Sequence, residues 1–194
     1  AVLLGEDGQY HGQYYKTHLV PFGEYVPFKR FLPFLAPLVE AVGDFTPGTI
    51  ETPLLHGKSR AGILICFESV FPGLSRQWVE AGANILVNLT NDAWYGKSSA
   101  PIQSLAMTVL RAVETRRSVV RSANTGISAF ITPVGEINKK SDIFVTWAEK
   151  GDLTLHEEKT FWVQYGYNFP PICLAFAVVA LMITGVMARR EGLD

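Results

Sequence analysis

The chain has 194 residues, with 17 lysines and arginines against 18 aspartates and glutamates and a formal net charge of −1 at pH 7. This balance excludes the basic surface on which nucleic-acid binding depends, so no nucleic-acid partner is expected. Hydrophobic residues make up 48% of the chain, which excludes a disordered protein and is typical of a globular or membrane-associated one. The length suits one domain with a substantial core.

The first fifteen residues predict a β-hairpin. Residues 1–4 (AVLL) resemble the continuation of a strand, GEDG at 5–8 predicts a turn, and a second strand follows through residue 15. The sequence has no start methionine and no signal peptide. We therefore expect the chain to be the C-terminal part of a longer protein.

Residues 16–48 predict a long structured loop, because prolines interrupt the segment too often for one regular element. Its middle, residues 28–42, is apolar except for an early basic pair, Lys29 and Arg30, and a late Glu40. This composition suits a segment that lies on a membrane surface. Packing of the same residues on the core of the domain is an equally open interpretation.

The next elements alternate between strand and helix. Residues 61–67 predict a buried strand, 72–82 a short helix and 85–89 a second apolar strand, which indicates an α/β sandwich. A helix follows from Pro101. It is amphipathic, and its apolar face, which normally covers the core, contains Ile102, Leu105, Ala106, Val109, Leu110 and Val113.

Four further segments predict the remaining strands: residues 119–121, 127–132, 144–147 and 153–156, with turns at 124–126 and 133–136. The sequence contains no glycine-rich phosphate loop and no clustered histidine and cysteine spacing. We therefore expect neither a cofactor nor a metal.

Residues 170–188 (PPICLAFAVVALMITGVMA) carry no charge and predict a transmembrane helix. At 1.5 Å per residue they span about 28 Å, close to the hydrocarbon thickness of a bilayer. Aromatic residues precede the segment and two arginines follow it, so the positive-inside rule places residues 189–194 in the cytoplasm and residues 1–169 outside it. A buried core helix at the end of a domain is the alternative.

Cys66 ends the apolar run GILIC and has two interpretations, a small core residue or a nucleophile at the end of a strand. The other cysteine, Cys173, lies in the apolar tail, so a disulfide is not expected. A thiol becomes a useful nucleophile when a neighbouring cation lowers its pKa. Lys16, which follows a predicted strand, and Glu24, which follows a turn, are able to converge on such a thiol.

Four motifs carry a family resemblance: YYKTHLVPFGEYVP, ICFE, NLTNDAWYG and RAVETRRSVVRSANTG. Together they resemble the nitrilase superfamily, and in particular its membrane-embedded branch, the apolipoprotein N-acyltransferases. The resemblance covers nearly the whole chain, and the PFGEYVP ending of the first motif is specific to that branch. It implies part of an αββα sandwich, followed by the transmembrane helix.

The resemblance also implies a Glu-Lys-Cys triad, with Cys66 as the nucleophile and Lys16 as the lysine; the triad glutamate is not in this chain. Glu24 would orient Lys16 or tune its charge, or it would only cap the loop. Phe67 stands where many relatives have tyrosine, and its backbone N–H would donate to an oxyanion. Glu68 would position the lysine or the incoming amine.

Trp94 and Tyr95 would form a mobile aromatic wall over an acyl chain, although ordinary packing explains them equally well. Asn124 and Gly126 match a turn of the family and are interpreted as architectural.

The implied activity is N-acyl transfer: a fatty acyl chain moves from a phospholipid through a cysteine thioester to the α-amine of a diacylglyceryl-cysteine lipoprotein, at a bacterial inner membrane. One alternative is an amidase of the nitrilase type, in which water resolves the thioester. Another is a non-catalytic, membrane-anchored domain that keeps the fold for binding.

Overall fold

The computed structural model describes residues 1–27 and 45–191 of the chain. The apolar segment predicted at residues 28–42 lies outside the described residues, so its membrane interpretation stays a prediction. Residues 1–27 and 45–191 contain eight strands. Their bounds are β1 Val2–Leu4, β2 Tyr10–Gln13, β3 Leu54–His56, β4 Ser59–Ile65, β5 Ile85–Asn91, β6 Ser118–Asn124, β7 Ala129–Ile131 and β8 Ile137–Lys140.

Four α-helices and three short 3₁₀ turns accompany the strands in the described part of the chain. The helices are α2 Pro72–Glu80, α3 Ala100–Thr115, α4 Phe161–Tyr165 and α5 Phe169–Glu191, and the 3₁₀ turns are η2 Cys66–Val70, η3 Ala93–Tyr95 and η4 Gly166–Asn168. The predicted hairpin, the strand–helix–strand unit from residue 61 and the helix after residue 100 are all confirmed within a few residues.

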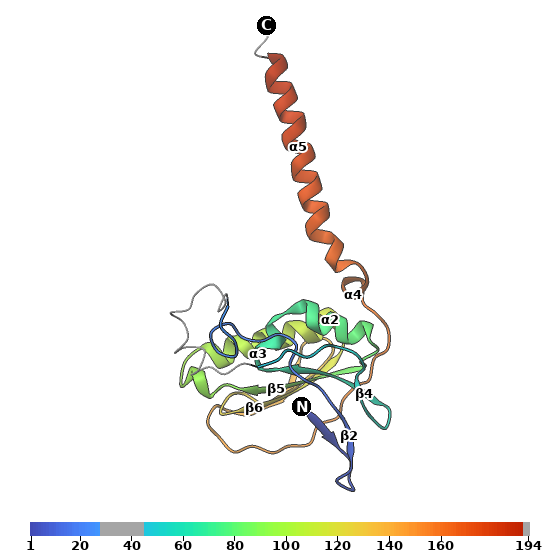
Figure 1. Cartoon of the computed structure of the whole chain (residues 1–194), viewed down its shortest axis with the longest axis vertical. Coiled ribbons are helices and arrows are strands. Elements are labelled where there is room, and N and C mark those ends of the chain that lie inside the picture. Colours follow the sequence, from blue (N-terminus) through green and yellow to red (C-terminus); the bar gives the residue numbers. More distant parts are fainter. Residues whose placement is uncertain (28–44, 192–194) are drawn as a thin grey trace.

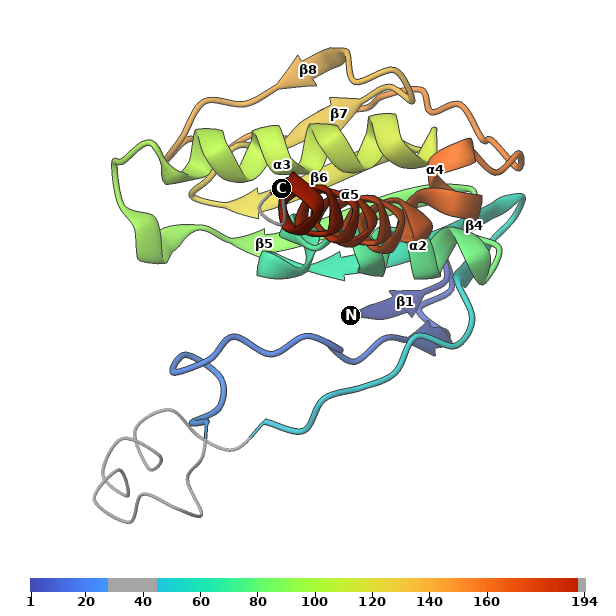
Figure 2. The ribbon, with the colours of Figure 1, turned by 90° about the horizontal axis from the view of Figure 1, so that it is seen from above.

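Six strands form one mixed sheet in the order β3-β4-β5-β6-β7-β8. The central strands β4, β5 and β6 are parallel, and the outer pairs are antiparallel. Helices α2 and α3 connect the parallel strands and lie on the same face of the sheet (Figures 1 and 2). The β1–β2 ribbon forms a separate two-stranded sheet near β3. These are one sheet and one helical layer of the expected partial αββα sandwich.

The core lies between this sheet and α2 and α3. Gly62 in β4 is essential to it, because an added Cβ would lie 2.7 Å from the Cβ of Trp78. Trp78 is buried and donates its indole N–H to the carbonyl of Ile63 at 2.6 Å. The close approach of α2 to β4 therefore depends on a residue without a side chain.

The predicted strands at 144–147 and 153–156 are wrong, since both segments are irregular. The second segment runs beside β6 but is held by a side chain: the Ser118 hydroxyl donates to the Thr154 carbonyl at 2.9 Å. The edge strands β3 and β8 were not predicted. Both are short, and all four residues of β8 are exposed, so neither has the apolar pattern that marks a central strand.

The predicted core face of α3 is also wrong, apart from Leu105, which is buried, and Val109, which is partly buried against the core. The buried residues of this helix include Thr108, Arg111, Ala112 and Thr115. Ile102, Leu110 and Val113 are exposed by 62%, 48% and 41%. The polar residues face inward because the sheet and the neighbouring turn offer them partners, such as the carbonyl of Val70 for Arg111.

Helix α5 rises away from the domain on the side of α2 and α3 (Figure 1). The helical stretch Phe161–Met187 is long and apolar enough to cross a membrane, with a mean hydropathy of 2.2 in its most apolar window. No part of this most apolar stretch is buried in the described residues, so α5 does not pack into the core of this domain. α4 joins α5 to the domain through the Arg76 guanidinium, which donates to the Val163 carbonyl at 2.6 Å and lies 4.6 Å from the Tyr167 ring centroid.

Candidate active site

Cys66 lies at the point where β4 ends and the η2 turn begins. Its φ of 53° is left-handed, a conformation that costs a residue with a side chain about 1–3 kcal/mol and that gathers at functional sites. Its carbonyl oxygen accepts from the Ser69 hydroxyl at 3.3 Å and from the Asn88 amide at 3.4 Å. The residue is half-buried, so the strand delivers the thiol to an edge of the core.

The thiol belongs to an open pocket of about 530 Å³ at the carboxyl ends of the parallel strands. Parallel strands end at a common edge, and side chains from consecutive strand ends meet there. The pocket is lined by Glu24, Ile65, Cys66, Leu89, Thr90, Asn91, Trp94, Ser122 and Asn124. This location favours the nucleophile interpretation of Cys66 over the core interpretation.

Glu68 holds the lysine-bearing segment against the cysteine turn. It is completely buried, and one carboxylate oxygen accepts from the backbone N–H groups of Thr17 at 2.7 Å and His18 at 3.0 Å. The other oxygen accepts from the N–H of Ile65 at 2.7 Å. These contacts support a role in positioning Lys16, the residue before Thr17, and leave Glu68 no exposed surface for an incoming amine.

Tyr14 completes the surroundings of Glu68. Its hydroxyl donates at 2.9 Å to the Glu68 oxygen that also accepts from Thr17 and His18. Its ring packs edge-on against Trp78 with a centroid distance of 5.0 Å. Burial, and then the charge of Glu68, raise the pKa of Tyr14. The phenol therefore remains a neutral donor over the physiological pH range.

Lys16 and Glu24 form a close ion pair. The ammonium Nζ lies 2.6 Å and 2.7 Å from the two carboxylate oxygens of Glu24, and only 10% of the lysine side chain is exposed. The N–H of Val20 donates to Glu24 at 2.9 Å, which fixes the carboxylate on its own loop. Glu24 and Cys66 line the same pocket, so the structure brings this ion pair to the wall of the cysteine site.

Gly48 packs against the backbone of the lysine segment. Its N–H donates to the carbonyl of Lys16 at 2.8 Å, and an added Cβ would overlap the carbonyl oxygen and the Cβ of Tyr15. A second chain segment thus fixes the position of Lys16 from outside the pocket.

The three predicted aromatic residues differ in their surroundings. Phe67 packs edge-on against Phe71, with a centroid distance of 5.4 Å. Trp94 lines the pocket and is 86% exposed. Burial first, and then the negative charges of Cys66 and Asp92, raise the pKa of Tyr95.

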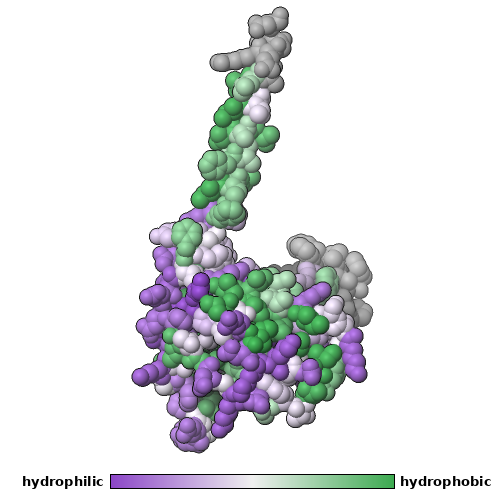
Figure 3. All heavy atoms as spheres, turned by 180° about the vertical axis from the view of Figure 1, so that it is seen from behind, coloured by the Kyte–Doolittle hydropathy of each residue, from purple (hydrophilic) through white to green (hydrophobic). Residues whose placement is uncertain are grey.

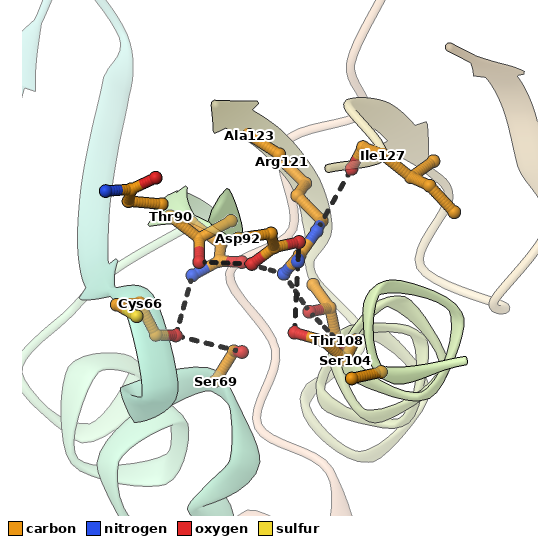
Figure 4. A network of polar contacts seen from close by, with 12 residues as sticks. Cys66, Ser69, Thr90, Asp92, Ser104, Thr108, Arg121, Ala123 and Ile127 are labelled. Atoms are coloured by element: carbon orange, nitrogen blue, oxygen red, sulfur yellow. Dashed lines mark hydrogen bonds and ion pairs between the residues drawn. The ribbon is translucent and has the colours of Figure 1, made fainter. Parts of the chain in front are cut away.

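A buried arginine behind the pocket was missed in the sequence. Arg121 lies in the middle of β6, and its guanidinium donates to the Asp92 carboxylate at 2.8 Å and to the side-chain oxygen of Asn88 (Figure 4). It also donates to Thr108 at 3.1 Å and Ser104 at 3.0 Å on α3. We call Arg121 and its four partners, Asp92, Asn88, Thr108 and Ser104, the Arg121 network.

The Arg121 network reaches Cys66 through Asn88. The Asn88 amide that accepts from Arg121 donates to the carbonyls of Leu64 and Cys66, at 2.9 Å and 3.4 Å. Burial lowers the pKa of Arg121, and the charge of Asp92 counters this effect. The one signal in the sequence was an arginine directly after two valines in the predicted strand, in the run SVVRSAN, where strand alternation places Arg121 on the same face as Val119.

Gly126 is required by the same network. An added Cβ at Gly126 would overlap the Asp92 carboxylate, with its Cγ at 2.7 Å. The architectural interpretation of this glycine therefore has a definite physical reason. Within residues 1–27 and 45–191, no group of three or more His, Cys, Asp or Glu side chains is placed to hold a metal ion.

Comparison with known proteins gives concordant results. The family model for carbon-nitrogen hydrolase matches residues 1–146. The apolipoprotein N-acyltransferase of Geobacter metallireducens is 49% identical over 193 residues, covering 100% of this chain and 36% of that protein. The enzyme of the same name from Bdellovibrio bacteriovorus is 40% identical over 189 residues, covering 93% and 33%. The chain thus spans about a third of the length of these relatives.

Solved structures agree at the level of the fold. A carbon-nitrogen hydrolase from Helicobacter pylori G27 superposes with a TM-score of 0.53 at 18% identity, covering 73% of this chain and 51% of that one. An amidase from Nesterenkonia sp. superposes with the same score at 21% identity, covering 73% and 50%. Because the family model matches three quarters of this chain, the chain belongs to the carbon-nitrogen hydrolase family.

Proposed function

We propose that the longer protein containing this chain is an N-acyltransferase that acts on lipoproteins. In the first half-reaction, the Cys66 thiolate attacks an ester carbonyl of a phospholipid, a thioester forms, and the lysophospholipid leaves as an alcohol after it takes up a proton. In the second, the α-amine of a diacylglyceryl-cysteine attacks the thioester carbonyl. An amide forms, the amine loses a proton, and the thiolate is released.

The observation that carries this proposal is the placement of Cys66. The residue has a left-handed backbone at the end of a parallel strand, and it opens into a pocket with Glu24, which holds Lys16. The Lys16 ammonium would stabilise negative charge on sulfur and pass protons to the leaving group. Glu24 would hold the ammonium in position, since both its oxygens contact it.

The oxyanion of each tetrahedral intermediate needs fixed donors. We assign this role to the backbone N–H of Phe67 and the Lys16 ammonium, and we expect the loss of one donor to cost about 3 kcal/mol of transition-state stabilisation. The family resemblance places the third triad member, a glutamate, outside these 194 residues. The proposal therefore applies to the complete natural protein.

Two lipid substrates require a site beside a bilayer. We propose that residues 170–188 span a bacterial inner membrane, that residues 1–169 form a catalytic domain on its outer side, and that residues 189–194 are cytoplasmic. Trp94 and Tyr95 would then form the wall against which the acyl chain lies. The exposed, apolar helix α5 supports this placement, and it argues against a soluble amidase.

The test uses the full natural protein reconstituted in vesicles that contain phosphatidylethanolamine with a labelled acyl chain. We expect a hydroxylamine-sensitive labelled adduct on the protein, absent from Cys66→Ser and present in the matched control Cys173→Ser. After addition of a diacylglyceryl-cysteine peptide, the label should move to the peptide as a hydroxylamine-resistant amide.

Three results would contradict the proposal. An adduct that persists in Cys66→Ser would exclude this nucleophile. Release of the label as free fatty acid, with none on the peptide, would indicate a hydrolase of the amidase type. The absence of any adduct in the wild-type protein would indicate a non-catalytic domain.

A further inference from the structure

Helix α3 turns an apolar face to the outside of the domain. Its outer residues include three large hydrophobic side chains, Ile102, Leu110 and Val113, exposed by 62%, 48% and 41%, and Met107 beside them, exposed by 40%. Val134, from the turn between β7 and β8, is 54% exposed. This turn lies against α3, because an added Cβ on the next residue, Gly135, would be 2.7 Å from the Val113 side chain. We call these five residues the α3 stripe. An exposed, contiguous apolar surface on a globular domain indicates a contact that is not seen in the isolated chain.

The charges around the α3 stripe have a distinct arrangement. Between Lys97 and Glu114 the one charged residue is Arg111, and it is buried against Val70 and paired with Glu114. Lys97 and Arg116, which flank the helix at its two ends, are both exposed. An uncharged apolar face with cations at its margins suits the boundary between acyl chains and anionic headgroups.

The direction of this face agrees with the direction of α5. The buried side of α3 packs on the sheet, so the α3 stripe looks away from the sheet. Seen along α5, helices α2 and α3 lie in front of the sheet (Figure 2), and α5 rises on that same side (Figure 1). In Figure 3, hydrophobic surface gathers on the upper part of the domain, toward the foot of α5.

The attachment of α4 fixes α3 close to the start of α5. The Thr160 hydroxyl, at the N-terminal cap of α4, donates to the carbonyl of Glu114 near the end of α3 at 2.6 Å. α4 and α5 are separated by the η4 turn alone, and that region exposes Phe161, Tyr165 and Phe169 by 77%, 52% and 70%. Such aromatic rings are typical of the membrane–water interface. The end of α3 is therefore anchored beside a segment with the composition of an interface.

We propose that the α3 stripe lies in the interfacial layer of the bilayer that α5 spans, with its side chains in contact with lipid. The helical layer of the domain then rests on the membrane, and the domain has a fixed orientation relative to it. This inference rests on the proposed membrane placement of α5. It adds a second, peripheral contact that is independent of the chemistry at Cys66.

The test measures the surroundings of single nitroxide labels in the full natural protein, reconstituted in vesicles of phosphatidylethanolamine and phosphatidylglycerol. All native cysteines, including Cys66 and Cys173, are replaced by serine. Labels are placed at Leu110→Cys and, as a second site, at Ile102→Cys. Leu55→Cys, on the 61% exposed position of β3, is the aqueous control, and Phe176→Cys, 74% exposed on α5, is the lipid control.

Power-saturation EPR then compares collisions with oxygen, which concentrates in lipid, and with a water-soluble nickel chelate. We expect both α3 labels to favour oxygen over nickel by at least threefold more than the Leu55→Cys label. Preferential nickel contact at both α3 sites would overturn the proposal. Low contact with both reagents would also overturn it, because it would mean that a second copy or another part of the protein covers the α3 stripe. If Phe176→Cys also favours nickel, the membrane placement of α5 fails as well, which separates the two proposals.

Discussion

Thr17 and Glu68 are 51 positions apart in the chain, yet the Thr17 N–H donates to the Glu68 carboxylate over 2.7 Å. The first residue follows the lysine of the site, and the second lies two positions after the cysteine. The buried carboxylate therefore sets the distance between the segment that carries Lys16 and the turn that carries Cys66. Glu68 acts through the backbone of neighbouring residues, so it needs no contact with Lys16 or Cys66 to fix their separation.

Replacing Glu68 by glutamine should slow acylation of Cys66 by at least tenfold and lower the thermal midpoint. A glutamine amide keeps the shape but turns two N–H donors toward groups that also donate, such as Ile65 N–H, and one unsatisfied buried donor costs about 1–3 kcal/mol. Thermal unfolding and the rate of adduct formation check this. The exposed Glu136→Gln is the control, and an unchanged rate in Glu68→Gln would refute the positioning role.

Lys16→Ala should leave the thiol present but reduce acylation by about a hundredfold or more, because one donor to the oxyanion and the proton carrier are both lost. The measurement is the rate of adduct formation, with alkylation by iodoacetamide to show that Cys66 is still accessible. Lys58→Ala, at an exposed lysine, should retain the full rate. Equal rates for the two variants would remove Lys16 from the mechanism.

The pair of Asp92 and Arg121 should show strong thermodynamic coupling. Asp92→Asn breaks this buried ion pair and leaves the guanidinium with neutral partners. Breaking a buried ion pair in this way lowers the free energy of unfolding by about 3–5 kcal/mol. The double variant Asp92→Asn/Arg121→Met should cost clearly less than the sum of the two single variants. A double-mutant cycle of unfolding free energies measures this, and additive costs would show that the two charges act independently.

Gly126→Ala should destabilise the protein and disturb the Arg121 network, because the new methyl group overlaps the Asp92 carboxylate. We expect a loss of about 1–3 kcal/mol, as is usual for overpacking. Gly185→Ala, at a glycine of α5 whose Cβ would meet open space, is the matched control and should have little effect on the thermal midpoint. The same midpoint for both variants would contradict the packing seen here.

The pKa of Tyr95 should fall when the charge of Cys66 is removed. Burial makes the largest contribution to the raised pKa, and a negative sulfur adds to it because it disfavours the phenolate. Cys66→Ser should therefore move the pKa downward but leave it above the ordinary value of 10.0. Carbon-13 NMR of ζ-labelled tyrosine follows the titration, with Tyr95→Phe to assign the signal. An unshifted pKa would mean that the sulfur is uncharged or distant.

The sequence predicts the elements that carry a simple pattern. The strand that ends just before Cys66, helix α2 and the apolar helix α5 were all expected. The strand contains a continuous apolar run, α5 is apolar throughout its span, and α2 repeats its apolar residues at helical spacing. The placement of Cys66 at a strand end also followed from the abrupt change from apolar to polar residues after it.

Two features escaped the sequence for physical reasons. The inward face of α3 is polar because Thr108 finds Arg121 of β6 and Arg111 finds the Val70 carbonyl, and periodicity alone assigns the apolar face to the core. The role of Glu68 depends on donors about fifty residues away, which no local pattern reveals. Both cases are tertiary hydrogen bonds that reverse or add to what hydrophobicity predicts.

The exposure of Trp94 has a consequence for how the protein tolerates substitution. The groups proposed to perform chemistry are fixed by buried contacts, whereas this indole projects from a short turn and is 86% exposed. Its replacement should therefore change stability by little. Under the proposed function, a substitution at this rim would change the contact with the acyl chain and leave the buried groups of the site in place.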